Sequence, residues 1–361
     1  MRIPGHDDPR TLYQTDALYH WQRGEYFPPV TVEVSPTHDC IQACRYCYSK
    51  NMMSRQESLR DDVLIGVFPQ MAEAGVKAVF VQGTGEPLLH KALPQAVTEG
   101  IKAGLSIGLT TSGVLLTKKL QDALLPLLLY VRFSVIDCDP NRYAYLHGCG
   151  KAQGLQLIEN IRDAVALRKE LDLPVSFLAS VYVEPDNFDH VIEIVKFYKD
   201  LGLDRISVQE ATYLNHSPAG PMPHTSTLYS DGAIQDLRSG LLQLCDDDFT
   251  VRVHFPINDA DYCSGEWKPG YCQGIKFGTL IGSDGEVYPC WRAWGNKALS
   301  YGSLYKQTFE QIWHGDRRRQ IERHILTIPS DGDECKACNA TTTNAILWRM
   351  TNATAWKDFL I

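Results

Sequence analysis

The stretch Cys40-Ile41-Gln42-Ala43-Cys44-Arg45-Tyr46-Cys47 is the part of the sequence on which the rest can be interpreted. Its three cysteines have the spacing C-x3-C-x2-C and follow a β-branched run at residues 30–34. A loop leaving a strand end can bring three thiolates to one metal centre, and thiolates select iron–sulfur clusters, zinc or Cu(I). A structural zinc needs a fourth ligand and more often uses C-x2-C. The spacing therefore favours a three-thiolate [4Fe–4S] cluster over a zinc knuckle or a chance group of buried thiols.

With Tyr46 before the third cysteine, the motif resembles the signature of radical S-adenosylmethionine (SAM) enzymes. The resemblance implies an open iron that binds the amino and carboxylate groups of SAM, and Tyr46 beside the adenine. It also implies that one electron cleaves SAM to a 5′-deoxyadenosyl radical, which takes a hydrogen atom from the substrate. Such chemistry belongs to the cofactor, while the protein supplies binding and orientation. The resemblance further implies an electron donor such as flavodoxin or ferredoxin.

Composition excludes several other classes of function. The chain has 361 residues, is 44% hydrophobic and carries a net charge of −8, which argues against nucleic acid as a partner. No apolar run approaches the roughly 20 residues of a membrane span, and the first residues contain no apolar signal-peptide core. Eleven cysteines without such a signal indicate a reducing cytoplasm and metal binding.

Residues 30–210 alternate strand-like and helix-like segments, which predicts βαβ units and a parallel sheet. The expected strands are Val30–Val34, Ala78–Gln82, Ser106–Thr110, Tyr130–Val135, Val175–Val183 and Arg205–Gln209. The expected helices are Asp61–Ala74, Leu93–Ala103, Thr117–Leu127, Gly154–Leu171 and Asp189–Leu201. Six units do not distinguish an open sheet from a partial barrel. The family resemblance implies an α/β fold with a partial (β/α)6 TIM-like barrel.

The pattern outside the barrel predicts three further regions. Residues 1–29 are expected to be an extension packed on the body, and the barrel is assigned to 30–225. Residues 211–270 contain five prolines and one expected helix, and residues 226–271 are assigned as a bridge. Two apolar runs flank Gly282-Ser283-Asp284-Gly285, which predicts a β-hairpin within a small C-terminal hairpin-plus-helix iron–sulfur domain, 272–361.

Residues that would bind SAM are expected at the ends of the strands. In Val81-Gln82-Gly83-Thr84-Gly85-Glu86-Pro87 two glycines allow a ligand close to the backbone, and the carboxylate can accept from a cation. The stretch resembles the family's "GGEP" element, which implies contact with the SAM amino group, although Thr84 stands where glycine is usual. Hydroxyl groups follow on later strands. The cofactor-binding set is Tyr46, Gly83, Thr84, Gly85, Glu86, Pro87, Thr110, Ser112, Ser134 and Ser180.

A second metal site is predicted from Cys272, Cys290, Cys335 and Cys338. The hairpin brings the first two thiols together and the C-x2-C pair completes four ligands, which on spacing alone suit zinc or [4Fe–4S]. Beside a radical SAM core, the set resembles a SPASM or twitch extension carrying auxiliary [4Fe–4S] clusters. No cysteine follows the last of the four, which favours the twitch form with one cluster. The order also resembles enzymes of the 2-deoxy-scyllo-inosamine dehydrogenase type.

An auxiliary cluster that accepts an electron makes a two-electron oxidation possible, such as alcohol to ketone, and this reaction needs a base. Glu210 and Asp137 follow predicted strands and are the candidate bases, and Cys263 is a candidate hydrogen donor. For each residue the alternative is an ordinary loop, core or salt-bridge position. Candidate substrate contacts are Arg142, Gln209, Tyr213, His216 and Arg292.

Three functions compete at this stage. The first is an oxidoreductase acting on a small polar metabolite such as a sugar, aminocyclitol or nucleoside. The second is a maturase that cross-links, epimerises or oxidises a ribosomally made peptide. About forty residues precede Cys40, too few for the leader-binding domain of many maturases, and this favours the small molecule. The third is a non-enzymatic iron–sulfur or zinc protein, against which residues 83–87 argue because a carrier needs no SAM site.

Overall fold

A computed structural model of the chain describes residues 14–47, 49, 57–210, 228–254, 272–327 and 341–352. Its strands are β1 Thr31–Val34, β2 Ala78–Val81, β3 Ser106–Thr111, β4 Tyr130–Ser134, β5 Ser176–Val183, β6 Arg205–Glu210, β7 Thr250–His254, β8 Gly278–Ile281, β9 Glu286–Tyr288 and β10 Gly302–Ser303. Its α-helices are α1 Thr15–Gln22, α2 Asp61–Glu73, α3 Leu93–Lys102, α4 Lys118–Leu124, α5 Pro140–His147, α6 Lys151–Glu170, α7 Val191–Asp200, α9 Asp231–Leu242, α11 Phe309–His314, α12 Asp316–Ile325 and α14 Thr341–Asn352.

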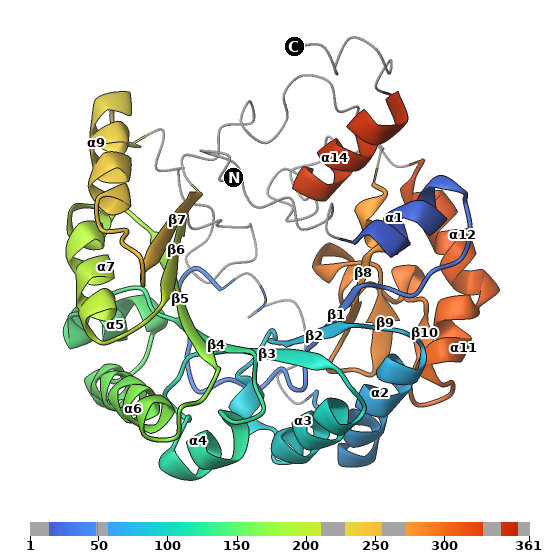
Figure 1. The fold of residues 1–361 in the computed structure, drawn as a ribbon, viewed down its shortest axis with the longest axis horizontal. Coiled ribbons are helices and arrows are strands. Elements are labelled where there is room, and N and C mark those ends of the chain that lie inside the picture. Colours follow the sequence, from blue (N-terminus) through green and yellow to red (C-terminus); the bar gives the residue numbers. More distant parts are fainter. Residues whose placement is uncertain are drawn as a thin grey trace.

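The strands form one curved sheet in the order β10-β9-β8-β1-β2-β3-β4-β5-β6-β7. From β1 to β7 every neighbouring pair is parallel and follows the order of the chain. Figure 1 shows this sheet bending around the centre of the molecule, with α2 to α7 on its outer side. The predicted partial TIM-like barrel is confirmed.

Alternation along the strands separates a packed face from an open one. In β4, Val131 and Phe133 are fully buried in the core, whereas Tyr130, Arg132 and Ser134 are partly exposed. The first pair packs beneath the outer helices, where Phe68, Phe177 and Tyr198 also lie, because successive side chains of a strand point to opposite faces. The residues of the other parity therefore define the concave face of the sheet.

The structure corrects two expectations about the predicted bridge and the C-terminal hairpin. The sequence predicts six strands, but β7 adds a seventh parallel strand within residues 226–271 and pairs with β6. The described part of the bridge thus continues the barrel. The hairpin β8–β9 is confirmed, but β8 pairs in parallel with β1, with Thr31 opposite Gly278. The C-terminal hairpin is therefore an extension of the barrel sheet.

The remaining described segments cover this junction. In the predicted N-terminal extension, Leu18 and Trp21 of α1 share a small apolar cluster with Phe27, Phe277 and Leu347 of α14. The described residues contain no helix that is long and apolar enough to cross a membrane. The assigned domain boundaries themselves remain a prediction.

Candidate functional site

The loop that carries Cys40, Cys44 and Cys47 leaves the carboxyl end of β1 and is held by the end of α5. The backbone N–H of Ala43 donates to the His147 carbonyl at 2.9 Å, and the backbone N–H of Arg45 donates to the Leu146 carbonyl at 3.1 Å. These backbone bonds fix the loop beside the concave face. Its position at the carboxyl ends of parallel strands is where such barrels bind their ligands.

The three thiols of this loop lie close enough to influence one another. Burial raises the pKa of the Cys44 thiol well above its ordinary value, and the charges of Cys47 and Cys40 raise it further. No three ligating side chains of the described residues converge as they would around a single metal ion. In a cluster each iron takes a separate thiolate, so three thiols from one loop fit a [4Fe–4S] group.

Gln42 of the loop and His147 of α5 hold the loop against the helix, and the sequence indicated neither role. Gln42 donates from its amide nitrogen to the Tyr143 hydroxyl at 2.9 Å, so its oxygen faces His147 Nδ1 at 2.8 Å. Because that oxygen can only accept, Nδ1 carries the hydrogen, and Cys44 Sγ lies 3.2 Å from it. Nε2 then accepts from the Tyr46 hydroxyl at 3.4 Å. Burial lowers the pKa of His147 to about 3, so the ring is neutral.

Gly148, which follows the last residue of α5, allows a test of whether the cysteine loop must pack this closely against the helix. Gly148 has a φ of +56°, and a Cβ there would lie 2.4 Å from the Ala43 carbonyl oxygen. We expect Gly148→Ala to displace the cysteine loop and to lower the iron content and SAM cleavage of the reconstituted protein by roughly tenfold. Gly150→Ala is the matched control, since its Cβ would meet nothing within 4 Å. Normal iron content in Gly148→Ala would contradict this packing argument.

The predicted "GGEP"-like element is packed directly against the cysteine loop. A Cβ on Gly85 would lie 2.2 Å from the Asp39 carbonyl oxygen, and the Glu86 N–H donates to that same oxygen at 2.8 Å. A Cβ on Gly83 would lie 2.8 Å from Ser35 Oγ, just past β1. The glycines are therefore required by the approach of β1 and its loop, in addition to any ligand.

Thr84, which departs from the usual glycine, is accommodated by its own hydrogen bonds. Its hydroxyl lies 2.9 Å from His38 Nδ1 and 3.3 Å from Ser35 Oγ. Its carbonyl accepts from the Ser49 hydroxyl at 3.1 Å, next to the third cysteine of the motif. The threonine thus links β1, the cysteine loop and the end of β2.

The Glu86 carboxylate is held by donors of the protein itself. It is buried and accepts from the N–H of Leu88 at 3.1 Å, the hydroxyl of Thr111 at 2.6 Å, and the N–H and hydroxyl of Ser112 at 2.8 and 2.6 Å. Four protein donors occupy its oxygens, so it does not stand ready for a cation as the sequence suggested. It joins the end of β2 to the end of β3, and Pro87 begins the short helix that follows. The Ser112 hydroxyl is committed to the same carboxylate.

The other expected hydroxyl groups do gather on the concave face. Ser134 on β4 pairs in register with Ser180 on β5, and Ser180 pairs with Ser207 on β6. Thr110 lies on β3, one level away, opposite Arg132. Parallel strands in register place paired residues on the same face, so these hydroxyl groups share one surface.

Aromatic residues connect that surface to the cysteine loop. The rings of Tyr46 and Tyr182 lie 5.1 Å apart between centroids. Tyr182 is the next concave residue of β5 after Ser180 and hydrogen-bonds the predicted substrate contact Gln209, its register partner on β6. The structure therefore brings Tyr46, the serines and Gln209 together.

Asp137 and Arg142 pair with each other instead of standing free for a substrate. The Arg142 Nε–H donates to Asp137 Oδ2 at 2.7 Å, and the Asp139 N–H donates to Oδ1 at 2.8 Å. Asp137 is 1% exposed. This ion pair fixes the start of α5, which does not support the predicted roles as base and substrate contact.

Of the remaining predicted catalytic and substrate residues, Glu210 does not lie on the concave face. Glu210 pairs in register with Val183 and shares the packed face of β6 with Val208, opposite Gln209. Arg292 is two residues after Cys290 in the chain, with its guanidinium carbon 3.9 Å from the Trp291 ring centroid. The rest of this set lies outside the described residues, namely Tyr213, His216 and Cys263.

Two of the four cysteines predicted to form the second site lie beside one buried tyrosine. Burial raises the pKa of Tyr301 well above its ordinary value, and Cys290 and Cys272 are among the charges that raise it further. The Tyr301 hydroxyl has no hydrogen-bond partner within the described structure. An orphaned buried donor beside two thiols fits a site for a sulfur-rich cluster. Cys335 and Cys338 lie outside the described residues.

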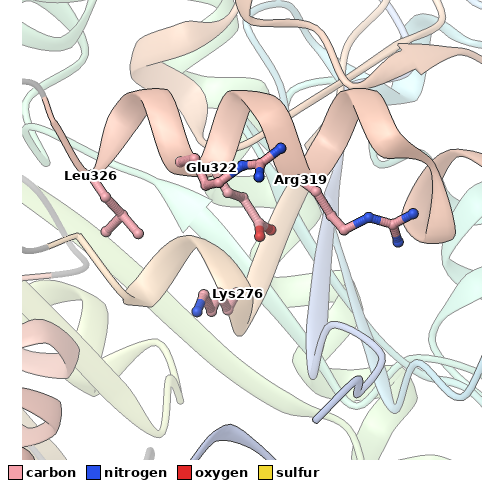
Figure 2. A pocket seen from close by; sticks show the side chains of 5 residues that line it. Lys276, Arg319, Glu322 and Leu326 are labelled. Atoms are coloured by element: carbon pink, nitrogen blue, oxygen red, sulfur yellow. The ribbon is translucent and has the colours of Figure 1, made fainter. Parts of the chain in front are cut away.

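The described structure also contains a pocket of about 210 Å³ away from these residues. It lies between α12 and the short helix Gly274–Lys276, and Lys276, Arg319, Glu322, Arg323 and Leu326 line it. Figure 2 shows the Glu322 carboxylate pointing from α12 toward Lys276. None of the predicted site residues lines this pocket, so it is not the predicted SAM site.

The chain matches two protein families. Residues 34–198 match the Radical SAM superfamily, and residues 272–339 match SPASM, an iron–sulfur cluster-binding domain. The chain carries a radical SAM domain and a SPASM domain. The radical SAM match runs from the last residue of β1 through the cysteine loop into α7, and the SPASM match spans all four cysteines of the second site.

The curated proteins similar to this chain include PqqA peptide cyclases. It is 21% identical over 319 residues to the PqqA peptide cyclase of Granulibacter bethesdensis, covering 86% of this chain and 80% of that protein. It is 26% identical over 296 residues to the PqqA peptide cyclase of Xanthomonas campestris pv. campestris, covering 80% and 74%. The similarity to each relative spans most of both chains.

Solved structures with the same fold include two enzymes. Streptococcus suis SuiB bound to S-adenosylmethionine aligns with a TM-score of 0.65 at 14% identity, covering 94% of this chain and 78% of SuiB. The structure of anSMEcpe with bound AdoMet and Kp18Cys peptide aligns with a TM-score of 0.57 at 16% identity, covering 87% and 88%. At these identities the likeness supports the fold alone.

A radical SAM domain implies SAM and a [4Fe–4S] cluster as cofactors, and a SPASM domain implies auxiliary iron–sulfur clusters. The three thiols of the radical SAM loop and the two thiols beside Tyr301 fit these groups. The assignment of individual residues to SAM, and the single auxiliary cluster favoured by the cysteine count, remain predictions.

Proposed function

We propose that this radical SAM enzyme modifies a peptide, by forming a cross-link or by a related oxidation. The observation that carries the proposal is the similarity to PqqA peptide cyclases, which covers 80–86% of the chain. SuiB, which shares the fold, has been solved bound to its precursor peptide SuiA. These similarities support the peptide alternative better than the small polar metabolite that the sequence favoured.

In this proposal Cys40, Cys44 and Cys47 hold the SAM-binding cluster. The backbone of residues 83–85, with Ser134 and Ser180, holds SAM. The chemistry supplied by these cofactors is abstraction of a hydrogen atom from the substrate. The protein contributes position: the neutral His147 holds Cys44 and Tyr46, and the Tyr46–Tyr182 pair covers the loop next to the concave face.

The rest of the concave face would hold the peptide. Gln209 presents its amide next to Tyr182, where it can orient a peptide group by hydrogen bonds. Cys272 and Cys290, with Cys335 and Cys338, would hold the auxiliary cluster. The β1–β8 pair joins the strand before the cysteine loop to the strand that follows Cys272, so one sheet positions both centres.

The test is a substrate screen with the reconstituted enzyme under anaerobic conditions, with dithionite as reductant. Peptides translated from short reading frames beside this gene are compared with a panel of sugars, aminocyclitols and nucleosides. We expect a peptide to raise 5′-deoxyadenosine formation at least about tenfold and to lose two hydrogens by mass spectrometry. Stimulation and product formation by a small metabolite alone would reject the proposal.

A further inference from the structure

Arg132 occupies a position on the concave face that the assigned roles do not explain. It is the third residue of β4 and pairs in register with Thr110 on β3 and Leu178 on β5. Its alternation with the fully buried Val131 and Phe133 places its side chain on the open face of the sheet. It lies one level deeper in the barrel than the row formed by Ser134 and Ser180.

The surface beneath Arg132 is aromatic. A Cβ on Gly108 would lie 2.2 Å from the ring of Tyr130, so the absence of a side chain there lets this ring lie across β3. The rings of Phe80 and Tyr130 are 6.4 Å apart between centroids. The Arg132 guanidinium carbon lies 5.6 Å from the Tyr130 ring centroid, where a cation is attracted to the ring face. The guanidinium therefore lies over an aromatic floor made by the rings of Tyr130 and Phe80.

The charge of Arg132 has no anionic partner in the described structure. Its Nε atom is buried and makes no hydrogen bond within these residues. Elsewhere in the barrel Arg168 pairs with Asp204 and Arg142 with Asp137, while Arg205 donates to the Thr250 hydroxyl. Arg132 is partly exposed on the concave face, so its charge and its buried Nε–H are available to an anionic ligand.

Arg132 is also close to the residues that adjoin the cysteine loop. Arg132 and Tyr182 both lie on the concave face, on the adjacent strands β4 and β5, and the positive charge of Arg132 opposes the rise in the pKa of Tyr182 that burial causes. The ring of Tyr182 lies 5.1 Å from that of Tyr46 between centroids. A ligand held by Arg132 would therefore extend toward the proposed site of hydrogen abstraction.

We propose that Arg132 binds a carboxylate of the substrate, supplied by an acidic side chain of a peptide. A planar guanidinium binds a carboxylate with two parallel hydrogen bonds, and its aromatic floor keeps it in place. The proposed SAM elements at residues 83–87 follow the carboxyl end of β2, whereas Arg132 lies in the middle of β4. This depth favours the substrate over the SAM carboxylate. The inference rests on the proposed function.

A peptide selection tests the inference with a random library in place of a single substrate. The cluster-loaded enzyme with SAM is immobilised anaerobically and selected against a random heptapeptide phage library. We expect Asp and Glu to be enriched roughly tenfold over the input, and Arg132→Gln to lose this enrichment. Arg132→Glu should select Lys and Arg instead, and Arg132→Lys should retain part of the acidic preference.

Two further measurements separate the sources of the carboxylate. Titration calorimetry with SAM should give dissociation constants within about twofold for the wild type and Arg132→Gln. Arg205→Gln is the matched control from the same level of the sheet, and it should keep the acidic preference. Weakened SAM binding with unchanged peptide selection would overturn the inference, as would acidic enrichment that survives Arg132→Gln. Enrichment of peptides without acidic residues would overturn the Arg132 inference and leave the proposed function standing. Absence of any peptide binding would count against the Arg132 inference and the proposed function together.

Discussion

Replacing Cys44 with alanine is expected to abolish 5′-deoxyadenosine formation, with a loss of at least about 100-fold and of about four irons per chain. Cys44 is the buried central thiol of the loop, and both neighbouring cysteines influence its pKa. Two thiolates do not retain the cluster that the third helps to hold. The measurement is iron and sulfide content after anaerobic reconstitution, followed by SAM cleavage with dithionite.

Cys149→Ala is the control, since Cys149 lies 4.0 Å from the amide nitrogen of Gln42 in the loop but is not part of the cysteine motif. The amount of iron that remains in Cys44→Ala gives the number of auxiliary clusters. About four remaining irons match one auxiliary cluster and about eight match two. Unchanged iron content, or zinc in its place, would refute the assignment of this loop.

Replacing Glu86 with glutamine is expected to lower the free energy of unfolding by about 3–5 kcal/mol, since four donors converge on its buried carboxylate. The amide nitrogen of glutamine would face the hydroxyl and N–H donors of Ser112 or Thr111. Those donors would then be left without an acceptor inside the protein. Urea unfolding of the cluster-free protein measures the loss.

Glu99→Gln serves as the comparison, because Glu99 makes an exposed ion pair with Lys102 on α3 and should change the free energy of unfolding by less than about 0.5 kcal/mol. If Glu86→Gln kept full stability but lost SAM binding, the carboxylate would be a cofactor contact and its structural role would be wrong.

The barrel strands were predictable because their sequences alternate and end in glycine-rich or polar turns. The expected segment Ala78–Gln82 and the observed β2 differ by one residue. β7 was missed because it lies within a proline-rich stretch, and its concave positions are Arg252 and His254 instead of apolar residues. α5 was missed although Asp139 caps it, because eight residues give little periodicity.

The site was predictable only where it depends on local sequence. The cysteine spacing identified the loop, but the contact of Cys44 with His147 spans 103 positions in the chain. Arg142 donates a hydrogen bond to Asp137, and Ser112 donates one to Glu86. Both interactions follow from side-chain geometry, which residue type alone does not specify. The cysteine order suits both small-molecule and peptide enzymes, so substrate class required comparison with relatives.

The pairing of β1 with β8 means that the boundary between the two domains is not a place where the chain can be divided. A fragment ending before residue 272 would leave β1 as an uncovered outer strand, with its N–H and C=O groups open to other chains. The C-terminal segment therefore supplies the strands β8 to β10 that extend the barrel sheet beyond β1. Protein engineers who exchange auxiliary domains among such enzymes would have to transplant the sheet edge along with the cysteines.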